Sequence, residues 1–157
     1  MGSDFLVLDL PPGTGDVALT MAQKLKVTGV VMVTTPQEVA LQDVYKSVSM
    51  CTKLSLPILG VIENMSYFVP PDMPEKKYHI FGEGGGARVA AEYEVPFLGE
   101  VPIDVRVRQG GDDGFPFVLD PESGSLGDAF RGLASNVISE VRRINARTSA
   151  STVEISL

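Results

Sequence analysis

Near its start the chain reads Phe5-Leu6-Val7-Leu8-Asp9-Leu10-Pro11-Pro12-Gly13-Thr14-Gly15-Asp16. An apolar run that reaches a carboxylate and then a Pro/Gly turn predicts a buried strand, Phe5 to Leu10, which carries Asp9 to the carboxyl edge of a sheet. Ligands bind along that edge in open α/β folds, and magnesium takes oxygen ligands while it keeps several waters. The stretch therefore predicts one half of a nucleotide site, with Asp9 facing the metal.

The phosphate side of such a site is only partly present in the chain. Gly13 and Gly15 allow the backbone to approach a phosphate closely. Asp16 either caps the following helix or positions a water, and both interpretations stay open. The phosphate-cradling motif G-x-x-x-x-G-K-[ST] occurs nowhere in the 157 residues.

The composition narrows the class of protein. A length of 157 residues suits one domain or less, and 44% hydrophobic residues are enough for a packed core. The balance of 13 basic and 20 acidic residues, with a net charge of −7, argues against a nucleic-acid surface, which needs clustered Lys and Arg. Cys51 is the single cysteine, which rules out an internal disulfide and suits a reducing compartment. No apolar stretch approaches the ~20 residues that span a bilayer, and we see no signal peptide.

The fold class follows from apolar runs that are near-continuous rather than alternating. Such runs are typical of parallel strands covered on both faces by helices. Segments with helical spacing lie between them, which predicts an α/β fold with a doubly wound, mostly parallel sheet and right-handed crossovers. The four runs are Phe5 to Leu10, Val30 to Thr34, Ile58 to Ile62, and Pro96 to Val101.

Sequence features typical of helices lie between and after these runs. Thr35 is a predicted N-cap, with Pro36 at the first helical position and Glu38 closing a capping box. This helix is expected to bury Ala40, Val44, Val48 and Cys51. The Gly84-Gly85-Gly86 triplet follows no strand, so a helix lead-in or hinge is favoured over a phosphate loop. The last helix carries apolar residues three and four apart: Leu126, Phe130, Leu133, Val137, Val141 and Ile144.

Five motifs in order give the chain a specific resemblance, which runs from Asp4 to about Val141. They are Asp9 to Asp16, Thr34-Thr35-Pro36-Gln37, Glu63-Asn64-Met65-Ser66-Tyr67-Phe68, His79-Ile80-Phe81-Gly82, and Gly99-Glu100-Val101-Pro102-Ile103. Together they resemble the Mrp/ApbC family of ATP-dependent iron–sulfur cluster carriers. These are P-loop NTPases related to MinD and to the nitrogenase iron protein.

The resemblance implies roles for matching residues. Asp9 is similar to the Walker B aspartate that holds magnesium through water, and Gly13 to the residue whose backbone N–H meets the terminal phosphate. With Asp16 they make up the expected catalytic set. Asn64 resembles the residue whose amide, a donor and an acceptor, reads the adenine edge. From its position alone, Asn64 also reads as a strand-end turn residue. Pro102 and Ile103 stand where the family flanks the base.

The chain departs from the family in lacking the nucleotide-binding loop and everything before the Walker B strand. In this fold that loop follows a central strand, which lies between the Walker B strand and the strand ending at Thr34. Its absence is expected to leave a gap that exposes unpaired backbone and apolar surface. Residues 1–146 are therefore interpreted as the C-terminal part of one P-loop NTPase domain, and 147–157 as a disordered tail. The chain alone is not expected to hydrolyse ATP, because phosphoryl transfer needs the loop.

A second departure concerns the cluster. Many family members carry C-x-x-C after the Asn-Met-Ser motif, and a dimer shares one cluster across these thiolates. Here Pro70 and Met73 stand at those positions, and neither replaces a thiolate. The Pro-Pro-Asp-Met run resembles a variant of cyanobacterial-type members, with any cluster held elsewhere or not at all. Cys51 is expected to pack in the core, and His79, the single histidine, to be structural or solvated.

Three functions remain open on this resemblance. The first is an ATPase that uses ATP and Mg²⁺, forms a homodimer and passes iron–sulfur clusters between scaffold and recipient proteins. The second is a MinD/ParA-like regulatory switch without a cluster, and the third is a non-catalytic scaffold. No nucleic acid or membrane is expected as a partner. The expected location is the cytoplasm, or the plastid stroma in a photosynthetic eukaryote.

Overall fold

The computed structural model describes residues 4–10, 20 and 23–151. The strands are β1 (Val30–Thr34), β2 (Ile58–Phe68) and β3 (Phe97–Ile103). The helices are α2 (Glu38–Lys53), α3 (Gly85–Glu92), α4 (Val105–Asp113) and α5 (Gly124–Ser151), with a short 3-10 helix η1 (Phe117–Leu119).

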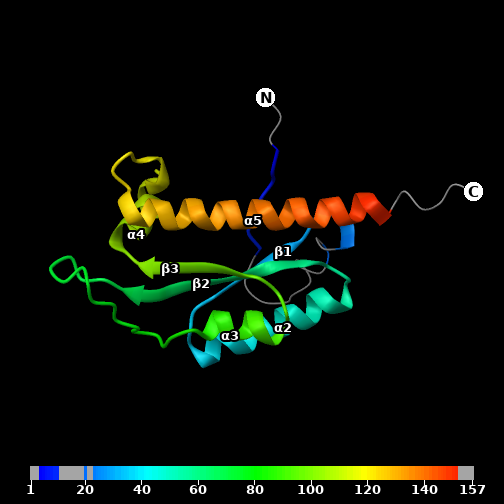
Figure 1. The fold of residues 1–157 in the computed structure, drawn as a ribbon, viewed down its shortest axis with the longest axis horizontal. Coiled ribbons are helices and arrows are strands. Elements are labelled where there is room, and N and C mark those ends of the chain that lie inside the picture. Colours follow the sequence, from blue (N-terminus) through cyan, green and yellow to red (C-terminus); the bar gives the residue numbers. More distant parts are fainter. Residues whose placement is uncertain (1–3, 11–19, 21–22, 152–157) are drawn as a thin grey trace, which may run out of the picture.

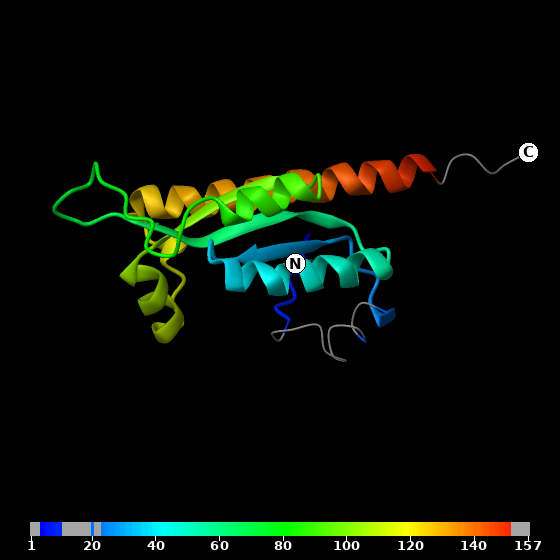
Figure 2. The ribbon, with the colours of Figure 1, turned by 90° about the horizontal axis from the view of Figure 1, so that it is seen from below.

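The three strands form a parallel sheet in the order β1-β2-β3. Helices α2 and α3 cover one face of this sheet and α5 covers the other (Figure 1, Figure 2). Each strand is followed by a helix, so the crossovers that parallel strands require are present. The predicted α/β fold, a parallel sheet wound with helices on both faces, is confirmed.

The larger core lies between the sheet and the α2/α3 layer. It is built from residues that are at most 6% exposed: Met32, Leu41, Val44, Val48, Cys51, Val61, Val89 and Ala90. The expected burial of Val44, Val48 and Cys51 is confirmed. Ala40 is only half-buried, whereas Leu41 is fully buried, so Leu41 takes the place predicted for Ala40 at the N-terminal end of the buried face.

The predicted start of α2 was wrong. The helix begins at Glu38 with Gln37 as N-cap, in extended backbone and with no side-chain cap bond. Thr35 and Pro36 stay outside the helix because Pro36 packs on the N-terminus of α3, where a Cβ built on Gly85 would lie 2.6 Å from the Pro36 carbonyl oxygen. This packing places Pro36 beside α3 rather than in the first turn of α2.

The second core lies between the sheet and α5. Leu98, Val101 and Leu133 are buried there, with Val31, Ile62, Phe130 and Val137 packed against them. The helix continues to Ser151, so residues 147–151 are not the disordered tail that was expected. No Gly or Pro interrupts the chain after Gly132, and the Thr148 hydroxyl donates to the Ile144 carbonyl one turn earlier. Residues 152–157 lie outside the described residues.

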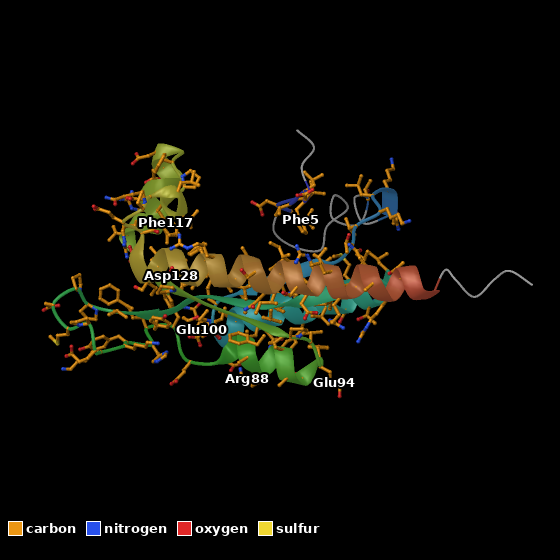
Figure 3. All side chains as sticks on the ribbon, turned by 45° about the horizontal axis from the view of Figure 1, so that its top comes forward. Phe5, Arg88, Glu94, Glu100, Phe117 and Asp128 are labelled. Carbon is orange, nitrogen blue, oxygen red and sulfur yellow. The ribbon has the colours of Figure 1, made fainter. Side chains whose placement is uncertain are left out.

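The predicted strand Phe5 to Leu10 is not a strand in the structure. Its side chains are exposed, with Leu6 at 83% and Val7 at 89%, and Figure 3 shows Phe5 on a segment that stands apart from the sheet. A strand needs a neighbour to accept its backbone hydrogen bonds. β1 is the edge of the sheet on this side, and its Val33 is 59% exposed, which agrees with the expected gap between β1 and the Asp9 segment.

Within the described residues, none of the helices combines the length and the apolarity that a membrane span requires.

Candidate functional site

Parallel pairing of β2 and β3 brings two of the expected site segments to neighbouring positions. Asn64 on β2 is paired with Val101 on β3, and Pro102 and Ile103 follow directly. Asn64, Pro102 and Ile103 are all half-buried, so each is partly open to a ligand. The register of the sheet therefore brings Asn64 close to Pro102 and Ile103.

Asn64 stands at an irregular point of β2, where the register with β3 shifts. Its Oδ1 accepts a hydrogen bond from the Met65 backbone N–H at 2.9 Å. Met65 adopts the left-handed region with φ of 55°, which is uncommon for a residue with a side chain. Among the described residues the Asn64 Nδ2 amino group has no partner. Asn64 thus opens an irregularity inside β2, the Asn64 bulge (residues 64–66), and still offers donors to a ligand.

The segment after Ile103 is held by an ion pair at the start of α4. Asp104 is the N-cap, and its Oδ1 accepts from the Arg106 backbone N–H at 2.9 Å and from Arg106 Nε at 3.0 Å. Its Oδ2 accepts from Arg106 Nη2 at 2.7 Å. The Arg106 side-chain hydrogen bonds lower the pKa of Asp104, against a smaller opposing effect of burial. This cap fixes where the chain turns away from Pro102 and Ile103.

Replacing Asp104 by alanine is expected to lower the free energy of unfolding by about 1 kcal/mol at pH 7, the usual value of an N-cap. Because the folded pKa of Asp104 is lowered, this stability is present above the unfolded pKa of about 3.9 and is lost as pH falls through the folded pKa. Urea unfolding at pH 7 and below pH 4 measures it, and the two proteins should converge in acid. Asp112→Ala, which removes an exposed ion pair with Arg108, is the control and should cost less; an equal loss from both variants would contradict the cap.

Glu63 is a polar residue of this region to which the sequence analysis assigned no role. It is 1% exposed, and its Oε2 accepts a hydrogen bond from the Gly86 backbone N–H at 2.6 Å. An acid inside a buried strand was a visible signal, because a buried charge needs a partner. The partner lies 23 residues away, and only the fold identifies it.

The glycine triplet is a helix lead-in, as favoured from the sequence. Gly84 is the N-cap of α3 with φ of 70°, a conformation that suits glycine. A Cβ on Gly86 would lie 3.0 Å from Glu63 Cβ. Small residues at these positions therefore let the N-terminus of α3 approach both β2 and the β1–α2 link.

The loop that follows β2 projects from one end of the sheet (Figure 1, Figure 2). Its base is closed by two backbone hydrogen bonds of 2.9 Å between Phe68 and Tyr78. At its tip the Met73 N–H donates to the Pro70 carbonyl at 3.1 Å, which makes a turn of residues 70–73. The positions at which the family pattern has two cysteines are thus held close together by this turn.

The expected structural roles of His79 and Cys51 agree with their surroundings. His79 Nδ1 lies 3.2 Å from the Ser66 carbonyl oxygen, so its ring joins the loop to β2. Cys51 is fully buried in the α2 core, and burial raises the pKa of its thiol, which disfavours the thiolate that metals bind. Over the described residues, no three His, Cys, Asp or Glu side chains gather in a way that could hold a metal ion.

Of the catalytic set expected from the sequence, only Asp9 falls among the described residues, because Gly13 and Asp16 lie outside them. Asp9 is exposed on the segment outside the sheet, so its carboxylate is open to solvent. The structure therefore brings together the residues expected around a base and leaves the expected metal ligand accessible.

Comparison with known families and proteins places these features in context. The family model ParA, described as NUBPL iron-transfer P-loop NTPase, matches residues 2–138. This range includes the Asp9 stretch, the Asn64 bulge and the Pro102 segment.

Among curated proteins, an iron–sulfur cluster carrier protein of Synechocystis sp. is 42% identical over 138 residues, which are 88% of this chain and 39% of the relative. A protein of the same description from Aquifex aeolicus is 50% identical over 88% of this chain and 37% of its own length. An iron–sulfur protein required for NADH dehydrogenase, mitochondrial, from Arabidopsis thaliana is 42% identical over 90% of this chain and 45% of its own length. The chain thus spans less than half the length of these relatives.

Two solved structures share the fold. A nucleotide-binding protein from Archaeoglobus fulgidus, in complex with ADP, has a TM-score of 0.59 and 40% identity over 67% of this chain and 43% of its own. The cell division ATPase MinD of Pyrococcus furiosus has a TM-score of 0.65 and 26% identity, over 87% of this chain and 52% of its own.

Proposed function

Because the chain belongs to the NUBPL iron-transfer family of P-loop NTPases, we propose that it forms part of an ATP-binding protein that carries iron–sulfur clusters to recipient proteins. The observation that carries this proposal is the family match over residues 2–138. It covers the Asn64 and Pro102 segments, which the parallel register sets side by side. Family membership confirms the resemblance drawn from the motifs.

ATP hydrolysis is assigned to a longer form of the protein. The relatives are more than twice as long as the matched region, and the sequence printed here has no G-x-x-x-x-G-K-[ST] motif. The free edge of β1 and the exposed Asp9 segment support a strand that fits between them and ends in the phosphate loop. Phosphoryl transfer relies on the amides and lysines of that loop, so turnover is expected of the longer form.

In the longer form, Asp9, Gly13 and Asp16 serve the phosphates, while Asn64, Pro102 and Ile103 hold the base. An exposed carboxylate such as Asp9 is a hard oxygen donor and fits a magnesium ion bound through water. Magnesium supplies charge neutralisation at the phosphates. Asn64 contributes its amide to the base, and Pro102 and Ile103 contribute apolar surface beside it.

In this proposal the iron–sulfur cluster is the cargo that the protein carries, not a resident cofactor. Within the described residues, no set of thiolates is available to bind it: Pro70 and Met73 occupy the family positions and Cys51 is buried. We therefore place the ligands of any cluster outside the described residues. ATP-dependent homodimerisation and recipient or scaffold proteins as partners belong to the same proposal.

A second function is favoured by the missing cysteine pair and by the likeness to MinD. A nucleotide-controlled switch without cargo would need the Asn64 site but no cluster. Iron and sulfide analysis after anaerobic reconstitution of the full-length protein separates the two functions.

The proposed location is the cytoplasm or an organelle. The organelle would be the plastid, or the mitochondrion that is named for the Arabidopsis relative.

Nucleotide binding tests the proposal. The full-length protein is expected to bind a fluorescent ADP analogue, and Asn64→Ala is expected to raise its Kd about tenfold, because one side-chain hydrogen bond contributes ~1–1.5 kcal/mol. Asn136→Ala is a matched control, since Asn136 donates to the Leu98 carbonyl on the α5 side. The proposal fails if the wild-type protein binds no nucleotide, and the role of Asn64 fails if the two variants bind ADP equally well.

A further inference from the structure

We propose that Glu63 is a positioning residue for the nucleotide base: its buried carboxylate ties the N-terminus of α3 to the Asn64 bulge of β2. The inference rests on the proposed function, because it concerns the same base site. It assigns a role to a residue that does not touch the ligand. Two contacts that meet at Glu63 carry the proposal.

The first contact is made by the side chain. Glu63 is 1% exposed, and its Oε2 accepts the Gly86 N–H at 2.6 Å. Gly86 is the second residue of α3, where backbone N–H groups have no partner within the helix and a negative charge is favourable. Hydrogen bonds to a charged acceptor are short and strong. The carboxylate therefore fixes α3 against the middle strand of the sheet.

The second contact is made by the backbone of the same residue. The Ser66 hydroxyl, also 1% exposed, donates to the Glu63 carbonyl at 2.9 Å. This bond spans the Asn64 bulge, which contains the left-handed Met65. A left-handed residue with a side chain persists where the surroundings hold it. The backbone on both sides of Asn64 is thus held by bonds that begin at Glu63 and Met65.

The surroundings leave Glu63 little freedom. Its Cα is paired with Thr34 on β1 and with Glu100 on β3, so it lies in the central strand. A Cβ on Gly86 would press on its side chain at 3.0 Å. The Ser66 carbonyl oxygen lies 3.2 Å from His79 Nδ1, and this contact joins the Asn64 bulge to the projecting loop. A shift of α3 would therefore move the Asn64 bulge.

The test uses nucleotide affinity of the full-length protein. Glu63→Ala is expected to raise the KM for ATP about tenfold and to leave kcat within about twofold, because it disturbs base binding rather than the phosphates. Glu63→Gln keeps an acceptor for the Gly86 N–H and is expected to restore most of the affinity. Gly86→Ala perturbs the same contact from the helix side and should weaken binding as Glu63→Ala does.

Val61→Ala is the matched control. Val61 lies two residues earlier on the same strand and is fully buried in the α2/α3 core. Truncating its side chain therefore destabilises the fold without removing a contact of the Asn64 bulge. The proposal is overturned if Val61→Ala and Glu63→Ala raise KM equally at matched thermal stability, or if Glu63→Gln is as impaired as Glu63→Ala. Should Glu63→Ala fail to fold, Glu63→Gln and Gly86→Ala decide by the same comparison. A wild-type protein that binds no nucleotide would instead reject the proposed function itself.

Discussion

Replacing Asp9 by alanine in the full-length protein is expected to lower kcat for ATP hydrolysis by about 100-fold, with ADP binding retained. The expected loss reflects the removal of a carboxylate that holds magnesium through water. A metal ion contributes several kcal/mol of charge stabilisation in phosphoryl transfer, and a loss of about 2.7 kcal/mol corresponds to 100-fold in rate. Phosphate release under saturating ATP and magnesium measures the effect.

The control is Asp4→Ala. Asp4 is exposed on the same segment as Asp9, so this variant removes the same charge without removing the expected metal ligand, and its turnover should match the wild type. Binding of the ADP analogue without magnesium shows that each variant still folds around the base. Wild-type turnover of both variants would mean that Asp9 does not face the metal.

Introducing two cysteines at Pro70 and Met73 of the full-length protein is expected to create a cluster site at these two positions. The turn closed by the Met73 N–H and the Pro70 carbonyl, 3.1 Å apart, holds the two positions close together. Two chains of a dimer would then supply four thiolates, the usual ligand set of a cluster. After anaerobic reconstitution of the full-length protein, bound iron and sulfide should rise above the wild-type level by about one cluster per dimer.

A serine pair at the same positions is the control, because serine matches cysteine in size and offers no thiolate. Iron and sulfide content, together with the visible absorbance of a thiolate-bound cluster, distinguishes the two double variants. If the wild-type protein already binds as much iron and sulfide as the cysteine variant, the natural ligands lie elsewhere. If the cysteine pair gains no more than the serine pair, positions 70 and 73 do not face each other across a dimer.

The strands illustrate how far local pattern predicts structure. The run Val30 to Thr34 was predicted with the bounds that β1 has, because its apolar residues lie together in the chain. β2 extends to Phe68 rather than Ile62, since pairing with β3 and with Tyr78 continues through residues of mixed polarity. Those partners lie 10 or more residues away, and periodicity carries no information about them.

The candidate site divides in the same way. Asn64 and Pro102 were expected beside the base from the family motifs, and the parallel register sets Asn64 opposite Val101, one residue before Pro102. Glu63 was overlooked because its role depends on Gly86, and the N-cap predicted at Thr35 was wrong because Pro36 is held by Gly85. Both errors arise at the N-terminus of α3, where Gly85 and Gly86 contact segments that are far away in the sequence.

From the amino-acid order alone came the α/β class, the family and the residues expected around a nucleotide, since these depend on composition, short motifs and local periodicity. The tertiary structure alone shows that Phe5 to Leu10 does not form a strand. This segment is apolar enough for a strand, yet it lies exposed. A strand is stabilised by hydrogen bonds to a neighbour rather than by its own residues. The same holds for the Glu63 carboxylate, whose burial is tolerable only because α3 brings the Gly86 N–H to within 2.6 Å.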